Sequence, residues 1–229
     1  MIVTLDGPAG AGKSSAAKAL ARRLGIEFLD TGAMYRAVTY AGLRAAIDLR
    51  DQQALQVLLQ DFDLEMTGER VLLNGLDVTT AIRKAEVTRS SGMIADSPVV
   101  RRFLVDQQRR IAAGRNMVCE GRDQGTIVFP EAICKFFLTA NPLERARRRQ
   151  GDMAARGEDV DLQEVLRAQE ERDLRDAARD IAPMVPAVDA ILVDTTGQTL
   201  SQVVDRLERE VRNKCQLHPA AEREMRATT

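Results

Sequence analysis

A glycine-rich segment that carries a lysine and two serines lies near the start of the chain. It reads Gly-Pro-Ala-Gly-Ala-Gly-Lys-Ser-Ser and matches the pattern G-x4-G-K-[ST], between an apolar run and a helix-like stretch. In this setting the glycines let backbone N–H groups approach a triphosphate, Lys13 reaches the β- and γ-phosphates, and the Ser14 hydroxyl can bind Mg²⁺. The sequence therefore predicts a nucleoside triphosphate site formed by Gly7, Pro8, Ala9, Gly10, Ala11, Gly12, Lys13, Ser14 and Ser15.

A second group of polar residues follows at residues 30–36, which read Asp-Thr-Gly-Ala-Met-Tyr-Arg. Asp30 or Thr31 can cap a helix that starts directly after them. Thr31, Tyr35 and Arg36 then lie in the first turns, where a hydroxyl, a ring and a guanidinium could hold a base or sugar and a phosphate. The same residues also suit an ordinary capped helix with Tyr35 packed inward, and the segment alone does not decide between the two.

A third group follows the apolar run 117–119 and reads Glu-Gly-Arg-Asp-Gln-Gly-Thr. Ligand groups in parallel-sheet proteins lie at the carboxyl ends of strands. Glu120 is placed like the acidic residue that organises the waters of Mg²⁺, and Arg122 and Asp123 are charged residues enclosed by glycines. The alternative is a solvated turn without a ligand.

Two arginine-rich helical stretches complete the polar groups. Residues 145–149 include four arginines, and Arg172, Asp176 and Arg179 share one helical face at i, i+4 and i+7. Arginine binds phosphate through its planar fork. Alternating charges on a helix are, however, also typical of a solvated, salt-bridged surface.

The apolar pattern predicts how these groups are positioned. Unalternating strands separated by helices indicate an α/β fold with a buried parallel sheet and helices on both faces. Expected strands are 2–5, 117–119, 133–138 and 190–193, and expected helices are 13–24, 33–47, 98–112, 142–156, 161–178 and 200–212. Between them, the turn signals Thr67-Gly68 and Asn74-Gly75 separate three short runs, which predicts a small antiparallel three-stranded sheet over about residues 60–82.

Composition excludes several classes of protein. The 229 residues suit one α/β domain with an insertion or two small domains, and 45% of them are apolar, which is enough for a core. The net charge is −1 and aromatic residues make up 3%, which argues against nucleic acid and anionic lipid as partners. No apolar stretch is long enough for a membrane span, and the chain does not start like a signal peptide.

Cysteine and histidine usage narrows the chemistry further. Cys119, Cys134 and Cys215 lie too far apart for a metal-binding pair, which favours a reducing, cytoplasmic setting, and the first two are expected to be buried thiols. The single histidine, His218, falls in the polar stretch at the end of the chain. We therefore expect no imidazole general base and no zinc site.

Taken together, the motifs resemble those of bacterial cytidylate kinases in type and order. They are the phosphate-binding loop, L-D-T-G-A-M-Y-R, E-G-R-D-Q-G-T-I-V-F-P, and E-R-D-x-R-D-x-x-R with A-P-x-V-P-A after it, within about residues 2–212. The resemblance implies a P-loop kinase with a central parallel sheet flanked by helices, a small antiparallel insert in the domain that binds the nucleoside monophosphate (NMP), and a helical lid. The expected insert at 60–82 is similar to the one that marks the bacterial type.

The resemblance also implies a domain division. It gives a core of residues 1–30, 93–147 and 158–213, an NMP-binding domain of residues 31–92, and a lid of residues 148–157. Residues 214–229 are expected to form a flexible tail.

Site residues are implied in the same way. Arg36, Arg122 and Arg179 would grip the CMP phosphate, and Arg101 and Asp123 would read the cytosine edge. Arg172 and Asp176 would contact the sugar and its phosphate, and Arg148, with Arg147 or Arg149 as further candidates, would come from the lid. The CMP site would comprise Thr31, Tyr35, Arg36, Arg101, Arg122, Asp123, Arg172, Asp176 and Arg179. The catalytic set would be Lys13, Arg122, Arg148 and Arg179, with Mg²⁺ held by Ser14 and, through water, Glu120.

One position departs from the family pattern. Gly92 stands where the best-known members offer a serine to cytosine, directly after Ser90 and Ser91. Either Ser91 substitutes through a local shift, or one contact to the base is missing.

The expected function is ATP-dependent phosphorylation of CMP and dCMP in pyrimidine nucleotide metabolism, by a cytoplasmic monomer. Because the acceptor is an ionised phosphate, the reaction needs no general base. A P-loop kinase for a non-nucleotide acceptor such as shikimate, and a nucleotide-switch ATPase, are the alternatives.

Overall fold

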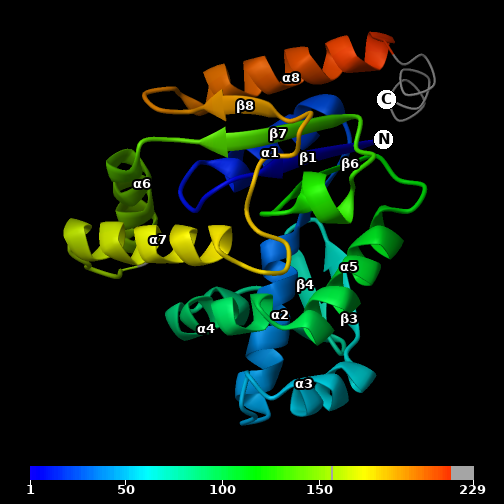
Figure 1. Cartoon of the computed structure of the whole chain (residues 1–229), viewed down its shortest axis with the longest axis vertical. Coiled ribbons are helices and arrows are strands. Elements are labelled where there is room, and N and C mark those ends of the chain that lie inside the picture. The colour runs from blue at the N-terminus through cyan, green and yellow to red at the C-terminus, as the bar shows by residue number, and fades with distance from the viewer. Residues whose placement is uncertain (156, 218–229) are drawn as a thin grey trace. The chain divides into compact units, whose positions relative to one another are not determined.

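The computed structural model describes residues 1–155 and 157–217 (Figure 1). Contacts between residues divide the chain into two compact units. The first unit contains residues 1–28 together with the described residues from 114 onward, and the second contains residues 29–113.

A five-stranded sheet forms the centre of the first unit. Its strand order is β2-β6-β1-β7-β8, in which β1 pairs in parallel with β6 and β7, and β7 pairs in parallel with β8. The strands are β1 Ile2–Asp6, β2 Glu27–Asp30, β6 Met117–Glu120, β7 Cys134–Thr139 and β8 Ile191–Asp194. The carboxyl ends of β1 and β6 are neighbours, so this order brings Asp6 and Glu120 to the same edge of the sheet.

The helices of the first unit are α1 Lys13–Leu24, α6 Pro142–Ala154, α7 Leu162–Ala177 and α8 Leu200–Leu217, and a single π-helical turn, η3 Gln124–Val128, follows β6. Helices α1 and α8 share a core with the inner strands (Figure 1). Helix α8 contributes Val203, Val204, Leu207, Val211 and Cys215, whose spacing forms one face of a helix. This core fixes β1 and α1, and therefore both ends of the loop between them.

The second unit combines helices with a small antiparallel sheet. Its elements are α2 Thr31–Arg44, α3 Gln52–Leu58, η1 Leu59–Asp61, β3 Leu64–Thr67, β4 Arg70–Leu73, β5 Leu76–Asp77, η2 Ala81–Arg83, α4 Ala85–Ala95 and α5 Pro98–Ala112. Asn74 (φ 50°) and Gly75 (φ 76°) both adopt the left-handed conformation that a type I′ hairpin requires. The sheet order β3-β4-β5 confirms the predicted insert.

The predicted α/β fold with helices around a parallel sheet is confirmed, and the main differences concern short elements and ends. Strand β2 and helices α3 and α4 were not expected. Helix α2 starts two residues earlier than predicted, because Asp30 accepts a hydrogen bond from the N–H of Ala33 and caps it.

The expected tail and the expected core range also differ from the structure. Helix α8 continues to Leu217 instead of ending near residue 212, since Cys215 is buried in the core, so residues 214–217 are not a tail; His218 lies outside the described residues. Contacts group α5 with the second unit, where it packs against α2, α3 and α4. The functional division into core, NMP-binding domain and lid stays a prediction.

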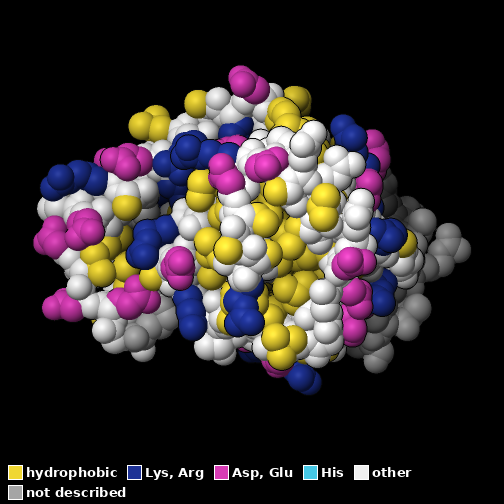
Figure 2. Space-filling view, turned by 90° about the horizontal axis from the view of Figure 1, so that it is seen from below, with side chains coloured by type: hydrophobic (Ala, Val, Ile, Leu, Met, Phe, Trp, Pro, Cys, Tyr) yellow, Lys and Arg dark blue, Asp and Glu magenta, His cyan; other side chains and the backbone are white. Residues whose placement is uncertain are grey.

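Charged side chains of both signs are distributed over the face seen in Figure 2, with hydrophobic groups between them. None of the described helices combines the length and the apolar character that a membrane span requires.

Candidate active site

The loop between β1 and α1 depends on glycine at three positions. Gly7 (φ 130°), Gly10 (φ 76°) and Gly12 (φ 85°) adopt conformations that side chains rarely allow. A Cβ on Gly7 would lie 2.0 Å from the carbonyl oxygen of Leu138. No side chain caps the start of α1 after Gly12, so its first N–H groups face the loop without a side-chain acceptor. The predicted phosphate-binding loop therefore has the backbone that its function needs.

Lys13 lies within this loop. It is buried, and its Nζ donates to the carbonyl oxygen of Pro8 at 2.8 Å. Burial, assisted by the neighbouring Arg122 guanidinium, lowers the pKa of Lys13 to about 7. A phosphate placed in the loop would favour the protonated ammonium.

Ser14 and Glu120, the two residues predicted to hold Mg²⁺, are neighbours at the edge of the sheet. The Ser14 hydroxyl donates to Oε1 of Glu120 at 2.5 Å, and Glu120 is buried at the end of β6. Within the part of the chain that the structure describes, no group of three or more His, Cys, Asp or Glu residues could hold a metal ion. One hydroxyl and one carboxylate nevertheless fit Mg²⁺ in a nucleotide complex, because this ion keeps several waters and takes its other oxygens from phosphates.

Asp6 is a central residue that sequence reasoning missed. Its carboxylate accepts hydrogen bonds from the N–H groups of Gln124 (2.9 Å) and Gly125 (2.8 Å), at the start of η3. Burial raises the pKa of Asp6 to about 6, although these two bonds partly oppose the shift. Asp6 thus holds the turn that carries Asp123. The sequence does contain a signal for Asp6: it directly follows the predicted first strand, just before Gly7, and functional groups of parallel-sheet proteins lie at the carboxyl ends of strands.

Three arginines surround the carboxylate of Asp176. Arg122 donates from Nε to Oδ2 (3.0 Å), Nη2 of Arg179 lies 2.7 Å from Oδ1, and Nε of Arg172 lies 4.0 Å from Oδ2. Asp176 is buried, which rules out the alternative that this face of α7 is only a solvated surface. The structure therefore brings together four predicted site residues, with a surplus of positive charge that suits a phosphate.

Arg148 lies on α6 beside the phosphate-binding loop. Its guanidinium donates to Oγ1 (2.9 Å) and to the carbonyl oxygen (2.8 Å) of Thr195 and pairs with Glu144. The Thr195 hydroxyl also donates to the carbonyl oxygen of Ala11 at 3.1 Å. Arg147, on the same helix, is exposed. Of these two arginines, Arg148 is the one that the structure connects to the loop.

In the second unit, Asp30 organises the start of α2. One carboxylate oxygen caps the helix and the other pairs with Arg36 at 3.0 Å. Nε of Arg36 is buried without a hydrogen-bond partner among the described residues, which leaves a donor for a ligand. Thr31 is buried, and Tyr35 is partly exposed rather than packed fully inward.

Arg101 joins this group from α5. Its guanidinium carbon lies 5.9 Å from the centre of the Tyr35 ring, and Nη1 donates to the carbonyl oxygen of Ala95 at 3.3 Å. Ser91 is buried on α4, where its hydroxyl donates to the carbonyl oxygen of Thr88 at 2.8 Å. For Ser91 to replace the missing serine, this bond would have to be exchanged.

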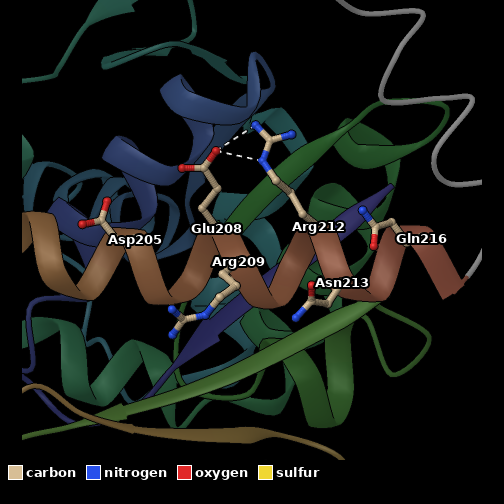
Figure 3. A pocket seen from close by; sticks show the side chains of 6 residues that line it. All are labelled: Asp205, Glu208, Arg209, Arg212, Asn213 and Gln216. Carbon is tan, nitrogen blue, oxygen red and sulfur yellow. Dashed lines mark hydrogen bonds and ion pairs between the residues drawn. The ribbon is translucent and has the colours of Figure 1, made fainter.

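A pocket on α8 has no predicted site residue in its lining. Figure 3 shows its six lining side chains, all on this one helix, with a hydrogen bond and an ion pair between Glu208 and Arg212. Arg23 of α1 also pairs with Asp205 and Glu208. These exposed ion pairs mark a solvated helix face.

The cysteines have no catalytic environment. Cys119, Cys134 and Cys215 are buried free thiols, which confirms the expectation for the first two. Burial raises the pKa of Cys119 and Cys134 and so suppresses their reactive thiolates.

Comparison with known proteins agrees with this geometry. The family model described as cytidylate kinase matches residues 3–213. A cytidylate kinase from Rhodopirellula baltica is 47% identical over 220 residues, covering 96% of each chain, and one from Caldanaerobacter subterraneus subsp. tengcongensis is 45% identical over 210 residues, covering 92% of this chain and 94% of its own. A solved structure of an uncharacterized protein from Eubacterium ventriosum, 10% identical, covers 93% of this chain and 98% of its own at a TM-score of 0.51, a likeness in fold alone. With its phosphate-binding loop, its arginine cluster and this degree of identity, the chain belongs to the cytidylate kinase family.

Proposed function

We propose that this protein transfers the γ-phosphoryl group of ATP to CMP and dCMP, which yields ADP with CDP or dCDP. Family membership supports the reaction. The structural observation that carries the proposal is the convergence of Arg122, Arg172 and Arg179 on Asp176, in the same compact unit as the phosphate-binding loop. A donor triphosphate and an acceptor phosphate would each have a set of cationic groups.

For the donor, residues 7–15 would hold the ATP phosphates through backbone N–H groups and Lys13. Mg²⁺ would be held by Ser14 and, through water, by Glu120; when bound, it neutralises charge on the phosphate oxygens. Arg148 would reach the γ-phosphoryl group by exchanging its bonds to Thr195. Each of these residues stabilises charge that grows during transfer.

For the acceptor, the proposed phosphate ligands are Arg36, Arg122 and Arg179. The cytosine edge would be read by Arg101 and Asp123, the sugar would be contacted by Arg172 and Asp176, and Thr31 and Tyr35 would complete the site. Because the attacking oxygen belongs to an ionised phosphate, the arginines have only to place it in line with the γ-phosphorus. No general base is needed, which fits a chain whose only histidine is His218.

We further propose that the protein is a cytoplasmic monomer that acts on small-molecule nucleotides. Three buried free thiols suit a reducing compartment. Light scattering at micromolar concentration would test the oligomeric state.

The test of the reaction is a coupled ADP-release assay with ATP, Mg²⁺ and CMP, dCMP, UMP, AMP, GMP or shikimate. We expect turnover with CMP and dCMP, and loss of nearly all turnover in Lys13→Ala, with its fold retained. Turnover with UMP as well would indicate a relaxed base pocket, in which Gly92 is the first residue to test by substitution with serine. No turnover with any nucleotide, from folded protein that binds ATP, would contradict the proposal.

A further inference from the structure

The turn of the phosphate-binding loop at Ala9 is held by side chains from two distant helices. Nη1 of Arg145, on α6, donates to the carbonyl oxygen of Ala9 at 3.0 Å. The N–H of Ala9 donates to Oδ1 of Asp173, on α7, at 3.3 Å. Both backbone polar groups of this residue are therefore bound by one pair of side chains.

Arg145 and Asp173 are themselves joined. Nη1 of Arg145 pairs with Oδ2 of Asp173, and Nε of Arg145 donates to the carbonyl oxygen of Ala140 at 3.1 Å. The Arg145 side chain is 8% exposed and that of Asp173 is 15% exposed. Since Asp173 balances the guanidinium charge, and Nε and Nη1 donate to acceptors within the protein, Arg145 is suited to holding the loop.

The next residue of the loop packs directly on the same helices. A Cβ on Gly10 would lie 2.8 Å from the carbonyl oxygen of Arg145 and 2.8 Å from Nε2 of Gln169. Nε2 of Gln169 donates to that same carbonyl oxygen at 3.4 Å, so α6, α7 and the loop meet at one point. With no room for a side chain between them, a shift of either helix must displace the loop.

We propose that Arg145 and Asp173 are positioning residues for the ATP site: together they fix the peptide groups of Ala9, and they link the loop to α6 and α7, the helices that carry Arg148, Arg172 and Asp176. The inference rests on the proposed function for the identity of the nucleotide. The inference gives the two arginines of α6 different roles. Arg145 holds the loop, whereas Arg148 is proposed to contact the γ-phosphoryl group.

The test is a cycle of variants, Arg145→Met, Asp173→Asn and the double variant, with ATP binding measured by calorimetry in the presence of Mg²⁺ and without an acceptor. We expect each single variant to weaken ATP binding by about tenfold, because a buried charged hydrogen bond is lost. The double variant should also be weaker by about tenfold rather than a hundredfold, since the two side chains act as a unit. The KM for CMP should change by less than about twofold.

Conservative variants and a matched control distinguish positioning from general destabilisation. Arg145→Lys, which keeps the charge, should recover part of the ATP affinity and remains measurable if Arg145→Met does not fold. Arg167→Met removes an exposed arginine from α7 and should leave ATP and CMP binding unchanged. Melting temperatures would show whether a loss of affinity follows a loss of stability.

Three results would overturn the inference: unchanged ATP affinity in the folded single variants, effects that multiply in the double variant, or equal weakening of ATP and CMP. The ATP titration contains no acceptor, so it remains decisive even if the substrate panel shows that CMP is not phosphorylated. Failure of the proposed function and failure of this inference are therefore separate outcomes.

Discussion

The carboxyl group of Asp6 makes the folding stability of the protein depend on pH. Burial raises its pKa from 3.8 to about 6. A group whose pKa is higher in the folded state binds its proton more tightly there, so the stability that it contributes is complete below pH 3.8 and is lost as the pH rises through 6. At about 1.4 kcal/mol per unit, the loss amounts to about 3 kcal/mol, most of it between pH 4.5 and 6.5.

Asp6→Asn removes this titration. We expect the variant to be less stable than the wild type by about 1 kcal/mol at pH 4.5, because the neutral carboxyl group of the wild type still offers two oxygens to the N–H groups of η3, whereas the amide offers one. Between pH 4.5 and 7.5 the free energy of unfolding of the variant should rise by about 2 kcal/mol relative to that of the wild type, because only the wild type loses the contribution of the protonated carboxyl group. Urea unfolding of the nucleotide-free proteins at four pH values measures this. A difference independent of pH would show that the carboxyl group does not titrate in this range.

The sequence predicted which residues belong to the candidate site where a local motif or the end of a strand marked them. Ser14 occupies a fixed position of a loop pattern and Glu120 ends strand β6, so the parallel sheet brings the two together across 106 residues. Arg145 and Asp173 were not predictable in the same way. Their partner is a backbone peptide of a third segment, and no spacing in the sequence records that contact.

At the scale of elements, two glycine-to-alanine substitutions should have opposite effects. Gly7→Ala places a methyl group 2.0 Å from the Leu138 carbonyl oxygen at φ 130°, so we expect a loss of more than about 3 kcal/mol. Gly151→Ala lies within α6, with no atom within 4 Å of the new Cβ, and should gain about 0.5–1 kcal/mol from helix propensity. Denaturant unfolding without nucleotide measures both.

The pair is its own control, since each variant adds the same methyl group. Equal effects of the two substitutions would mean that loop geometry does not limit stability. A destabilising Gly151→Ala would instead mean that this part of α6 needs the freedom of glycine.

Helices and strands were predicted well where capping residues or apolar runs mark them in the sequence, and missed where such local signals are weak. Helices α1 and α5 have the predicted bounds, because Gly25 in the left-handed conformation caps the end of α1, and Ser97 caps α5, whose first residue is a proline. Helix α4 contains Ser-Ser-Gly and has no side-chain cap, so its helical form depends on packing against α2. Strand β2 has four residues, only one of them fully buried, which left no apolar run to detect.

At the scale of the whole molecule, the two units differ in which proposed ligand contacts they contain. All residues proposed to hold ATP and Mg²⁺ belong to the first unit. The proposed CMP contacts Thr31, Tyr35, Arg36 and Arg101 belong to the second, whereas Arg122, Asp123, Arg172, Asp176 and Arg179 belong to the first. Each ligand should therefore leave a different pattern of protection along the chain.

Hydrogen exchange with mass spectrometry tests this division. A non-hydrolysable ATP analogue with Mg²⁺ should slow exchange in the first unit, at the phosphate-binding loop and the start of α1, and leave α2 and α5 unchanged, because binding suppresses local opening where contacts form. CMP should slow exchange at the start of α2 and in α5 as well as around η3. Lys13→Ala should lose the protection by the ATP analogue and keep that by CMP. Equal protection of both units by the ATP analogue alone would mean that its contacts, or the coupling between the units, extend beyond the residues assigned to ATP.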